Sequence, residues 1–335
     1  MQKNPRVSII TPSYNQARFI EQTIQSVLNQ DYPDLEYIIV DGASTDDSVE
    51  IIKKYAGCLA YWLSEPDSGQ SEAVNKGWQR ATGEIIGWLN SDDLLMPGAV
   101  SRMVKAFQET PEMSVIYGDV ISIDQEGQIF NIMRFDQWNL DDLMTFKIIS
   151  QPGAFMRADV LRQSGYLDRQ MHFLMDTHLW LKMAQFAPIR YLPGVVAAAR
   201  YHPGAKNVAA GARYGQDAYK IVEWMKTQPI LQEKLLRNPR QVWAGAHRIS
   251  ARYLLDGGDA KSALRDYLKA FRSHPPAVRE EAHRIFFCML SLVGMGGLKQ
   301  IYYQQRLKRR RRQQPDVYGS VERFLTGEVP SDSVS

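Results

Sequence analysis

The segment Trp88-Leu89-Asn90-Ser91-Asp92-Asp93 places two acidic residues directly after an apolar run. Carboxylates at the end of a buried strand can hold a hard divalent cation through their oxygens, while the diphosphate of a nucleotide supplies the other ligands. Asp92 and Asp93 are therefore candidate metal ligands. Two acids in a loop are also common as caps of the following helix, and the residues alone weigh the two interpretations equally.

A second polar segment, Asp41-Gly42-Ala43-Ser44-Thr45-Asp46-Asp47, follows another apolar run. Asp41 stands where the predicted strand ends, and it could accept a hydrogen bond from a base imide or a ribose hydroxyl. Ser44, Thr45 and the acids after them are residue types that cap helices. We interpret Asp41 as a binding residue and Asp46 as a cap.

Three further side chains have chemistry that depends on their surroundings. Asp176 stands at the start of a predicted helix, where it could act as a general base on a hydroxyl or simply cap that helix. His202 follows a predicted strand, but a lone histidine is more often structural than a ligand. Lys76 lies on a predicted helix where it could meet phosphates, although a solvated helix face explains it equally well.

Four repeats of strand and helix within about the first hundred residues would position these groups. The predicted strands cover residues 7–11, 35–40, 61–64 and 85–89, and a helix is expected after each, the last from about Pro97. This order predicts an α/β fold with a doubly wound, mostly parallel sheet flanked by helices. Ligands bind at the carboxyl ends of the strands in such sheets, so the polar residues should meet at one edge.

The chain is expected to divide into three parts. Residues 1–205 form the first domain, which includes β-type alternation over 115–134, a strand after residue 150 and two short strands at 189–192 and 195–201. Residues 206–314 show long helical patterns, and the stretch from Tyr253 to Pro275 resembles one tetratricopeptide-like hairpin. Residues 315–335 are expected to be a disordered tail.

Composition narrows the function classes. The chain has 44% hydrophobic and 23% charged residues, as in a globular protein. Its two cysteines, Cys58 and Cys288, have no metal-ligand spacing, and the start lacks the apolar stretch of a signal peptide, so we expect a cytoplasmic protein. Nucleic acid is not an expected partner, because the excess of basic residues is confined to 299–312.

The same basic segment, with the apolar residues 285–293 before it, has two interpretations. The apolar run is too short to span a bilayer, which needs about 20 residues. It could lie at the surface of an anionic membrane, at the inner face, where each Lys or Arg adds about 1 kcal/mol. Alternatively, it could form a core helix with a solvated basic end.

Five blocks in order resemble the family 2 inverting glycosyltransferases, which have the GT-A fold. The blocks are Val7 to Asn15, Ser26 to Gln30, Glu36 to Asp46, Gly69 to Gly77 and Gly83 to Asp93. The resemblance covers roughly residues 5–205. It implies a metal-dependent enzyme of the hexosyltransferase type that uses a nucleotide-sugar donor, expected to be a UDP-sugar.

The resemblance also implies roles for individual residues. Asp41 would bond the uracil, and Asp92 would ligate Mg²⁺ or Mn²⁺ on the diphosphate, with Asp93 and His202 as further candidate ligands. Asp176 would deprotonate the acceptor hydroxyl, and a single displacement would invert the anomeric centre. The other residues expected at the donor are Thr11, Pro12, Tyr14, Asn75, Lys76, Asn90 and Ser91.

Two departures from the family pattern support a rival interpretation. Asn90 replaces the first Asp of the metal motif, and Met175 precedes the presumed base where the family has an acid. They favour a non-catalytic domain that binds a nucleotide sugar while its helical region recruits a partner. The presence of Asp92, Asp176 and His202 together favours the enzyme. From the family resemblance and the basic tail, its acceptor is expected to be a saccharide or lipid-linked saccharide in surface polysaccharide or glycolipid synthesis. A dehydrogenase is disfavoured because no G-x-G-x-x-G follows the first strand.

Overall fold

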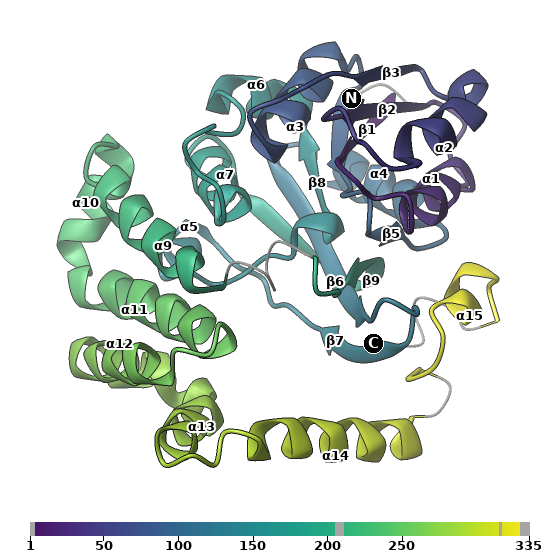
Figure 1. The fold of residues 1–335 in the computed structure, drawn as a ribbon. Coiled ribbons are helices and arrows are strands. Elements are labelled where there is room, and N and C mark those ends of the chain that lie inside the picture. The colour runs from purple at the N-terminus through teal and green to yellow at the C-terminus, as the bar shows by residue number, and fades with distance from the viewer. Residues whose placement is uncertain (1–3, 205–210, 315–316, 329–335) are drawn as a thin grey trace.

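A nine-stranded mixed sheet lies at the centre of the computed structural model, which describes residues 4–204, 211–314 and 317–328 (Figure 1). Its strands are β1 (Val7–Ser13), β2 (Leu35–Asp41), β3 (Tyr61–Ser64), β4 (Ile85–Trp88), β5 (Leu94–Leu95), β6 (Val115–Ile123), β7 (Ile129–Met133), β8 (Ala154–Arg157) and β9 (Ile189–Arg200). They run in the order β3-β2-β1-β4-β8-β6-β9-β5, and β7 pairs with β6.

The first four strands are parallel, as the sequence predicted. β1 pairs with β2 and β4, and β2 pairs with β3. β8 runs antiparallel between β4 and β6, whereas β6 and β9 are parallel. Because Ser13 is aligned with Asp41 and Asp41 with Ser64, the carboxyl ends of β1, β2 and β3 share one edge of the sheet.

Helices cover both faces of the sheet because neighbouring strand residues point to opposite faces and both sets are apolar. Ile9 packs in a core with helices α1 (Ile20–Leu28), α2 (Ser48–Lys54) and α4 (Ala99–Glu109). Ile10 packs in the other core with α3 (Gln70–Arg80), α5 (Leu140–Met144), α6 (Ala158–Ser164) and α7 (Met175–Met183). Short 3-10 turns occupy Ala56–Cys58, Gln151–Gly153 and Pro275–Glu281.

The region expected to be helical is helical. It comprises α9 (Gly211–Met225), α10 (Pro229–Arg237), α11 (Pro239–Asp256), α12 (Ala260–Ser273), α13 (Ala282–Leu292) and α14 (Leu298–Gln313). We call residues 211–313 the helical extension. The expected domain boundary at 205/206 falls within 205–210, outside the described residues.

The helical extension packs closely on the sheet-bearing part. Gly245 of α11 lies against the backbone of Thr145, where any Cβ would collide with the Thr145 carbonyl group. Three residues along, Arg248 donates to the Phe146 carbonyl at 2.8 Å. Ile221 and Val222 of α9 are buried in the same core as α7. None of the helices in the described part of the chain is long and apolar enough to cross a bilayer.

Residues 317–328 return to the sheet and include helix α15 (Glu322–Leu325). The sequence predicted a disordered tail here. Instead, Tyr318, Val321 and Phe324 are buried against a cluster that includes Ile121 and Val195. The backbone amides of Ile129 and Val321 also donate to carbonyls across this contact, each at 2.9 Å. We call residues 317–325 the C-terminal strap; residues 315–316 and 329–335 lie outside the described residues.

Two local predictions differ from the structure. The two short strands expected near 189–201 are one strand, β9, which crosses Pro193 and Gly194 with an irregular register against β6. The helix expected from about Pro97 begins at Ala99 with Gly98 as its N-cap. Asp92 and Asp93 therefore do not cap a helix, and the alternative interpretation of these two acids does not hold.

Candidate functional site

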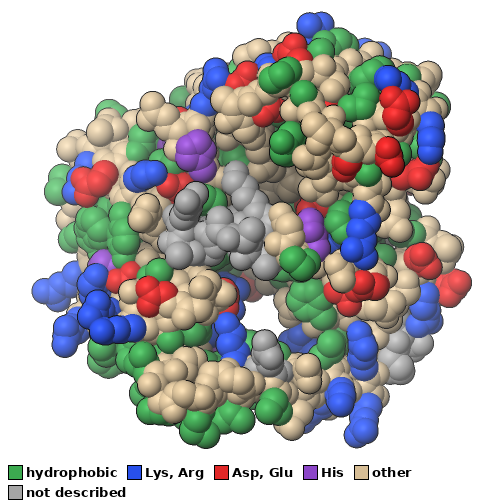
Figure 2. Space-filling model, in the orientation of Figure 1, with side chains coloured by type: hydrophobic (Ala, Val, Ile, Leu, Met, Phe, Trp, Pro, Cys, Tyr) green, Lys and Arg blue, Asp and Glu red, His purple; other side chains and the backbone are tan. Residues whose placement is uncertain are grey.

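A deep cleft of about 1660 Å³ opens at the carboxyl edge of the sheet. One wall comes from the loops after β1, β2, β3 and β4, and the opposite wall comes from α11, α13 and α14 of the helical extension. Figure 2 shows the hollow between the sheet-bearing part and α14, which runs along the lower edge in Figure 1. Single ligands usually occupy about 300–1000 Å³, so the cleft has room for more than one.

The turn after β4 is held by the side chain of Asn90. Its Oδ1 accepts from Gln70 at 2.8 Å and from the Trp88 indole at 3.0 Å. Its Nδ2 donates to Asp93 Oδ2 at 3.1 Å and to Gln151 Oε1 at 3.0 Å. Only an amide can make this set of bonds, because an aspartate would place a second carboxylate against Asp93. The departure from the family motif is thus accommodated by its surroundings.

Asp93 points into the protein rather than into open solvent. Its Oδ1 accepts the backbone N–H of Arg200 at 2.8 Å, and its own carbonyl accepts from Thr23 at 2.8 Å. Burial, followed by the charge of Asp92, raises the pKa of Asp93 well above its ordinary value. The Arg200 side chain donates to the Asp92 carbonyl at 2.9 Å, so Arg200 at the end of β9 holds both acidic residues in place. Asp93 lines the cleft, but its oxygens already have partners.

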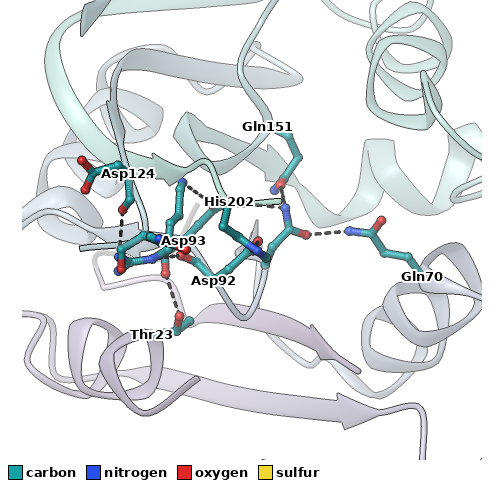
Figure 3. Close-up of polar contacts among 10 residues, drawn as sticks. Thr23, Gln70, Asp92, Asp93, Asp124, Gln151 and His202 are labelled. Atoms are coloured by element: carbon teal, nitrogen blue, oxygen red, sulfur yellow. Dashed lines mark hydrogen bonds and ion pairs between the residues drawn. The ribbon is translucent and has the colours of Figure 1, made fainter. Parts of the chain in front are cut away.

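Asp92 lines the cleft, and His202 lies directly behind it in contact with its carboxylate (Figure 3). Asp92 Oδ2 lies 3.0 Å from His202 Nε2, and the two side chains are 17% and 10% exposed. The imidazole ring also packs on Phe19 with 4.7 Å between ring centroids. One carboxylate and one imidazole side by side, with part of their surface open, can bind a divalent cation. Asp92 and His202 are therefore the side chains best placed to hold a metal.

The ends of β1 and β2 and the loops after β1, β2 and β3 form the part of the cleft suited to a nucleobase. Pro12, Tyr14, Gly42, Ala43 and Asp67 line it, and the Tyr14 ring is 61% exposed. A Cβ at Gly42 would lie 2.8 Å from Asp67 Oδ2 and 3.4 Å from the Tyr14 ring, so a larger residue there would displace the Asp67 side chain. The exposed ring offers a flat apolar surface against which a base can stack.

Two residues expected at the donor lie beneath this surface instead. Thr11 is buried, and its hydroxyl lies 3.1 Å from the Tyr37 hydroxyl. Asp41 is also buried, and its Oδ2 accepts from the Ser44 amide at 2.8 Å and the Ser64 hydroxyl at 2.7 Å. Neither side chain lines the cleft. Asp41 shapes the loop that carries Gly42 and Ala43. Asp46 accepts the Ser48 amide at the start of α2, but the N-cap position of that helix is Asp47.

Asn75 and Lys76 lie on α3, away from the cleft lining. The Asn75 amide exchanges hydrogen bonds of 2.9 and 3.0 Å with the backbone of Leu167. Lys76 pairs with Glu65 at 2.9 Å and Glu72 at 3.0 Å, and these partners raise its pKa. Asn90 and Ser91, by contrast, do line the cleft.

Asp176 lies in the first turn of α7 and lines the cleft together with Met175. Its Oδ1 accepts the Thr177 amide at 2.7 Å. The loop leading to it is fixed by the helical extension, because the buried carboxylate of Asp217 accepts the amides of His172 and Phe173 at 3.2 and 3.0 Å. The helical extension therefore positions the residue expected to act as the base.

Sequence reasoning missed the cleft residues that lie far along the chain. Gln151 begins the 3-10 turn Gln151–Gly153, and Arg252 comes from α11. Nothing local marks either residue, since a lone Gln in a loop or an Arg on a helix is usually solvated. Only the path of the chain brings them to the strand ends.

The fold is that of GT-A glycosyltransferases. A mannosyltransferase from Pyrobaculum calidifontis, solved with GDP-Man and Mn²⁺, matches with a TM-score of 0.58 at 20% identity, covering 92% of this chain and 87% of that one. S. aureus TarS 1-349, solved with UDP-GlcNAc, matches with a TM-score of 0.56 at 18% identity, covering 92% of each chain.

Sequence comparison gives the family. Residues 8–165 match the family model described as Glycosyl transferase family 2, so this part of the chain is a family 2 glycosyltransferase domain. It is 29% identical over 191 residues to the chondroitin synthase of Pasteurella multocida, a match that covers 56% of this chain and 20% of that protein. Two other curated glycosyltransferases are matched over only 35% and 36% of their length.

Proposed function

We propose that the chain transfers a sugar from a nucleoside diphosphate sugar, UDP-linked in the first instance, to a saccharide hydroxyl with inversion. One observation carries this proposal: the exposed Tyr14 ring, Asp176 and Asp92, which lies 3.0 Å from His202, all border a single cleft. The solved relatives support a nucleotide-sugar donor, since they were crystallised with UDP-GlcNAc or GDP-Man. The chondroitin synthase match supports a saccharide acceptor in polysaccharide synthesis.

The residues at the strand ends could bind a divalent cation only if the nucleotide-sugar donor completes its coordination sphere. Within the described ranges, no group of three or more His, Cys, Asp or Glu side chains could hold a metal alone. Asp92 and His202 would supply two ligands, and diphosphate oxygens and water the others, as Mg²⁺ and Mn²⁺ sites with nucleotides usually have. When bound, the cation would offset the charge that builds on the leaving diphosphate.

The side chains of this protein would share the remaining work. Tyr14 would stack on the base, which contributes about 1–3 kcal/mol in comparable base–aromatic contacts. Asp176 would accept the proton of the acceptor hydroxyl as its oxygen bonds to the anomeric carbon. The bond to the nucleoside diphosphate would break on the opposite face, so one displacement inverts the anomeric centre. Asp217 would hold the loop that orients Asp176.

The rival proposal is a domain that binds a nucleotide sugar without catalysis. Met175 favours it, because no second carboxylate precedes Asp176. Asn90 no longer does, since its four hydrogen bonds form a complete local network that leaves Asp92 in place. The two proposals differ in what Asp176 does for turnover.

The test combines donor binding with slow donor hydrolysis for UDP-, GDP- and dTDP-sugars in the presence of Mn²⁺. Asp92→Ala should abolish metal-dependent binding, and Tyr14→Ala should weaken it by about tenfold or more. Asp176→Ala should keep binding but lose turnover. Asp47→Ala removes an exposed acid outside the cleft and serves as the matched control. If folded protein binds no nucleotide sugar, the enzyme proposal fails. If the wild type binds a nucleotide sugar but never releases the nucleotide, the non-catalytic proposal is favoured, and if Asp176→Ala hydrolyses the donor like wild type, Asp176 is not the base.

The acceptor is proposed to be a lipid-linked saccharide presented at an anionic membrane surface. Exposed apolar side chains cluster where α13 turns into α14, and they include Phe286, Val293, Ile301 and Tyr302. Lys308, Arg311 and Arg312 continue the exposed surface along α14, and Figure 2 shows basic side chains along this lower edge. We call these seven residues the α13–α14 patch. Apolar contact combined with basic charge is the pattern that binds anionic lipid.

A further inference from the structure

The wall of the cleft that faces the strand ends carries arginines whose charge is not compensated. Arg252 of α11 and Arg306 and Arg310 of α14 all line the cleft. Within the described part of the chain, Arg252 and Arg306 have no hydrogen-bond or ion-pair partner. Arg310 donates to the neutral amide of Asn131 at 2.9 Å, and its guanidinium lies 5.7 Å from the centre of the Tyr318 ring.

The basic side chains next to these three arginines do form ion pairs with carboxylates. Arg284 pairs with Asp256 at 3.0 Å and with Glu281 at 3.2 Å. Lys299 takes the other oxygen of Asp256 at 2.9 Å. Asp256 and Glu281 are therefore already engaged. Glu280, which is exposed, also lines this wall without an ion pair to any described residue, so the three cleft arginines outnumber it and leave the wall positive.

The positive charge of this wall affects the titratable side chains beside it. Burial, followed by the charges of Arg284 and Arg306, lowers the pKa of His283, which also lines the cleft. Arg252 and Asp176 both act electrostatically on the buried Tyr253 phenol, so these two side chains face the same region. The positive wall thus borders the place where the acceptor hydroxyl would meet its base.

We propose that Arg252, Arg306 and Arg310 form the acceptor subsite and that the acceptor carries a phosphate or carboxylate near the reacting hydroxyl. This inference rests on the proposed transferase function and deepens it. The donor diphosphate has its own place beside Asp92 and His202 on the opposite wall. Guanidinium groups suit an anion on the acceptor because they donate in a planar fork that matches phosphate and carboxylate oxygens.

The anion could come from the diphosphate of a lipid-linked saccharide or from a hexuronate in a growing polysaccharide. Two matched pairs of probes separate these sources. Geranyl diphosphate is compared with geraniol, and a tetrasaccharide containing hexuronate is compared with its carboxyl-reduced form. Binding is measured by calorimetry on the full chain with saturating UDP and Mn²⁺, so that the donor side is occupied.

One anionic probe should bind at least about tenfold more tightly than its neutral partner. Arg306→Gln and Arg252→Gln should each remove most of that preference. Arg309→Gln is the matched control, because Arg309 is on the same helix but is exposed and does not line the cleft. Arg306 is itself exposed, so its variant is expected to fold, and thermal unfolding checks both.

Three results would overturn the proposal: equal binding of charged and neutral probes, loss of probe binding when UDP is added, or equal weakening in Arg309→Gln. Binding of UDP with Mn²⁺ to the same samples reports on the donor site separately. Failure there with intact probe binding would contradict the donor assignment and leave the anionic subsite standing. Normal binding of UDP with Mn²⁺ but no binding of the anionic probes would contradict the acceptor subsite alone.

Discussion

Replacing Asn90 by Asp restores the acidic residue of the family motif, and we predict that it destabilises this protein. Asn90 Nδ2 donates to Asp93 Oδ2 at 3.1 Å and to Gln151 Oε1 at 3.0 Å, and a carboxylate can do neither. Each lost hydrogen bond leaves a buried acceptor without a donor, which costs about 1–3 kcal/mol. With two such acceptors, we expect Asn90→Asp to lower the free energy of unfolding by about 2–6 kcal/mol.

Urea denaturation of wild type and Asn90→Asp at pH 7 measures this difference. Asn75→Asp is the matched control, because it also converts a partly buried amide to a carboxylate but loses only one donated bond, to the Leu167 carbonyl at 2.9 Å. It should cost about 1–3 kcal/mol. The reasoning is refuted if the free energy of unfolding of Asn90→Asp is within about 1 kcal/mol of the wild-type value, or if the variant binds Mn²⁺ more tightly than wild type in the absence of nucleotide.

Two further predictions concern the lower edge of the molecule and the contact between α7 and the helical extension. Changing Lys308, Arg311 and Arg312 of the α13–α14 patch to Gln should lower the partition coefficient onto anionic vesicles by about 100-fold, because each charge contributes about 1 kcal/mol. Vesicle pelleting measures this change. Neutral vesicles should pellet both proteins equally, and unchanged partitioning would remove the membrane proposal. The second prediction concerns His178, whose ring lies 4.3 Å from the Trp224 ring and whose pKa burial lowers from 6.5 to about 4. Since the unfolded chain binds this proton more readily, stability should be full above pH 6.5 and fall as the pH drops toward 4, by about 2 kcal/mol at pH 5. His178→Phe should remove that part of the pH dependence in urea titrations; an unchanged slope would contradict it.

The sequence predicted the central sheet well because its signals are local. Apolar runs, helical spacing and the polar residues after each strand are visible within about ten residues. The direction of side chains within those segments was harder to predict. Pro12 and Tyr14 line the cleft, whereas the neighbouring Thr11 is buried and its hydroxyl lies 3.1 Å from the Tyr37 hydroxyl.

The far wall of the cleft could not be predicted from local patterns. Which face of α14 turns inward depends on the path of the chain from α9 to the C-terminal strap, and the basic residues 306–312 look alike in sequence. The structure separates them, because Arg306 and Arg310 line the cleft while Arg309 does not. The strap was missed for a similar reason, since Tyr318, Val321 and Phe324 are too few to signal a buried segment until the sheet is in place.

The C-terminal strap has a consequence for how the protein is made. The sheet surface around Ile121 and Ile129 leaves the ribosome roughly 190 residues before Tyr318, which is about 10–40 s at ordinary rates of translation. During that interval an apolar surface next to the edge strand β5 has no cover. Newly made chains are therefore expected to depend on chaperones more than the finished protein does, and ribosomes stalled within the helical extension would hold a sheet-bearing domain that is folded but prone to aggregate.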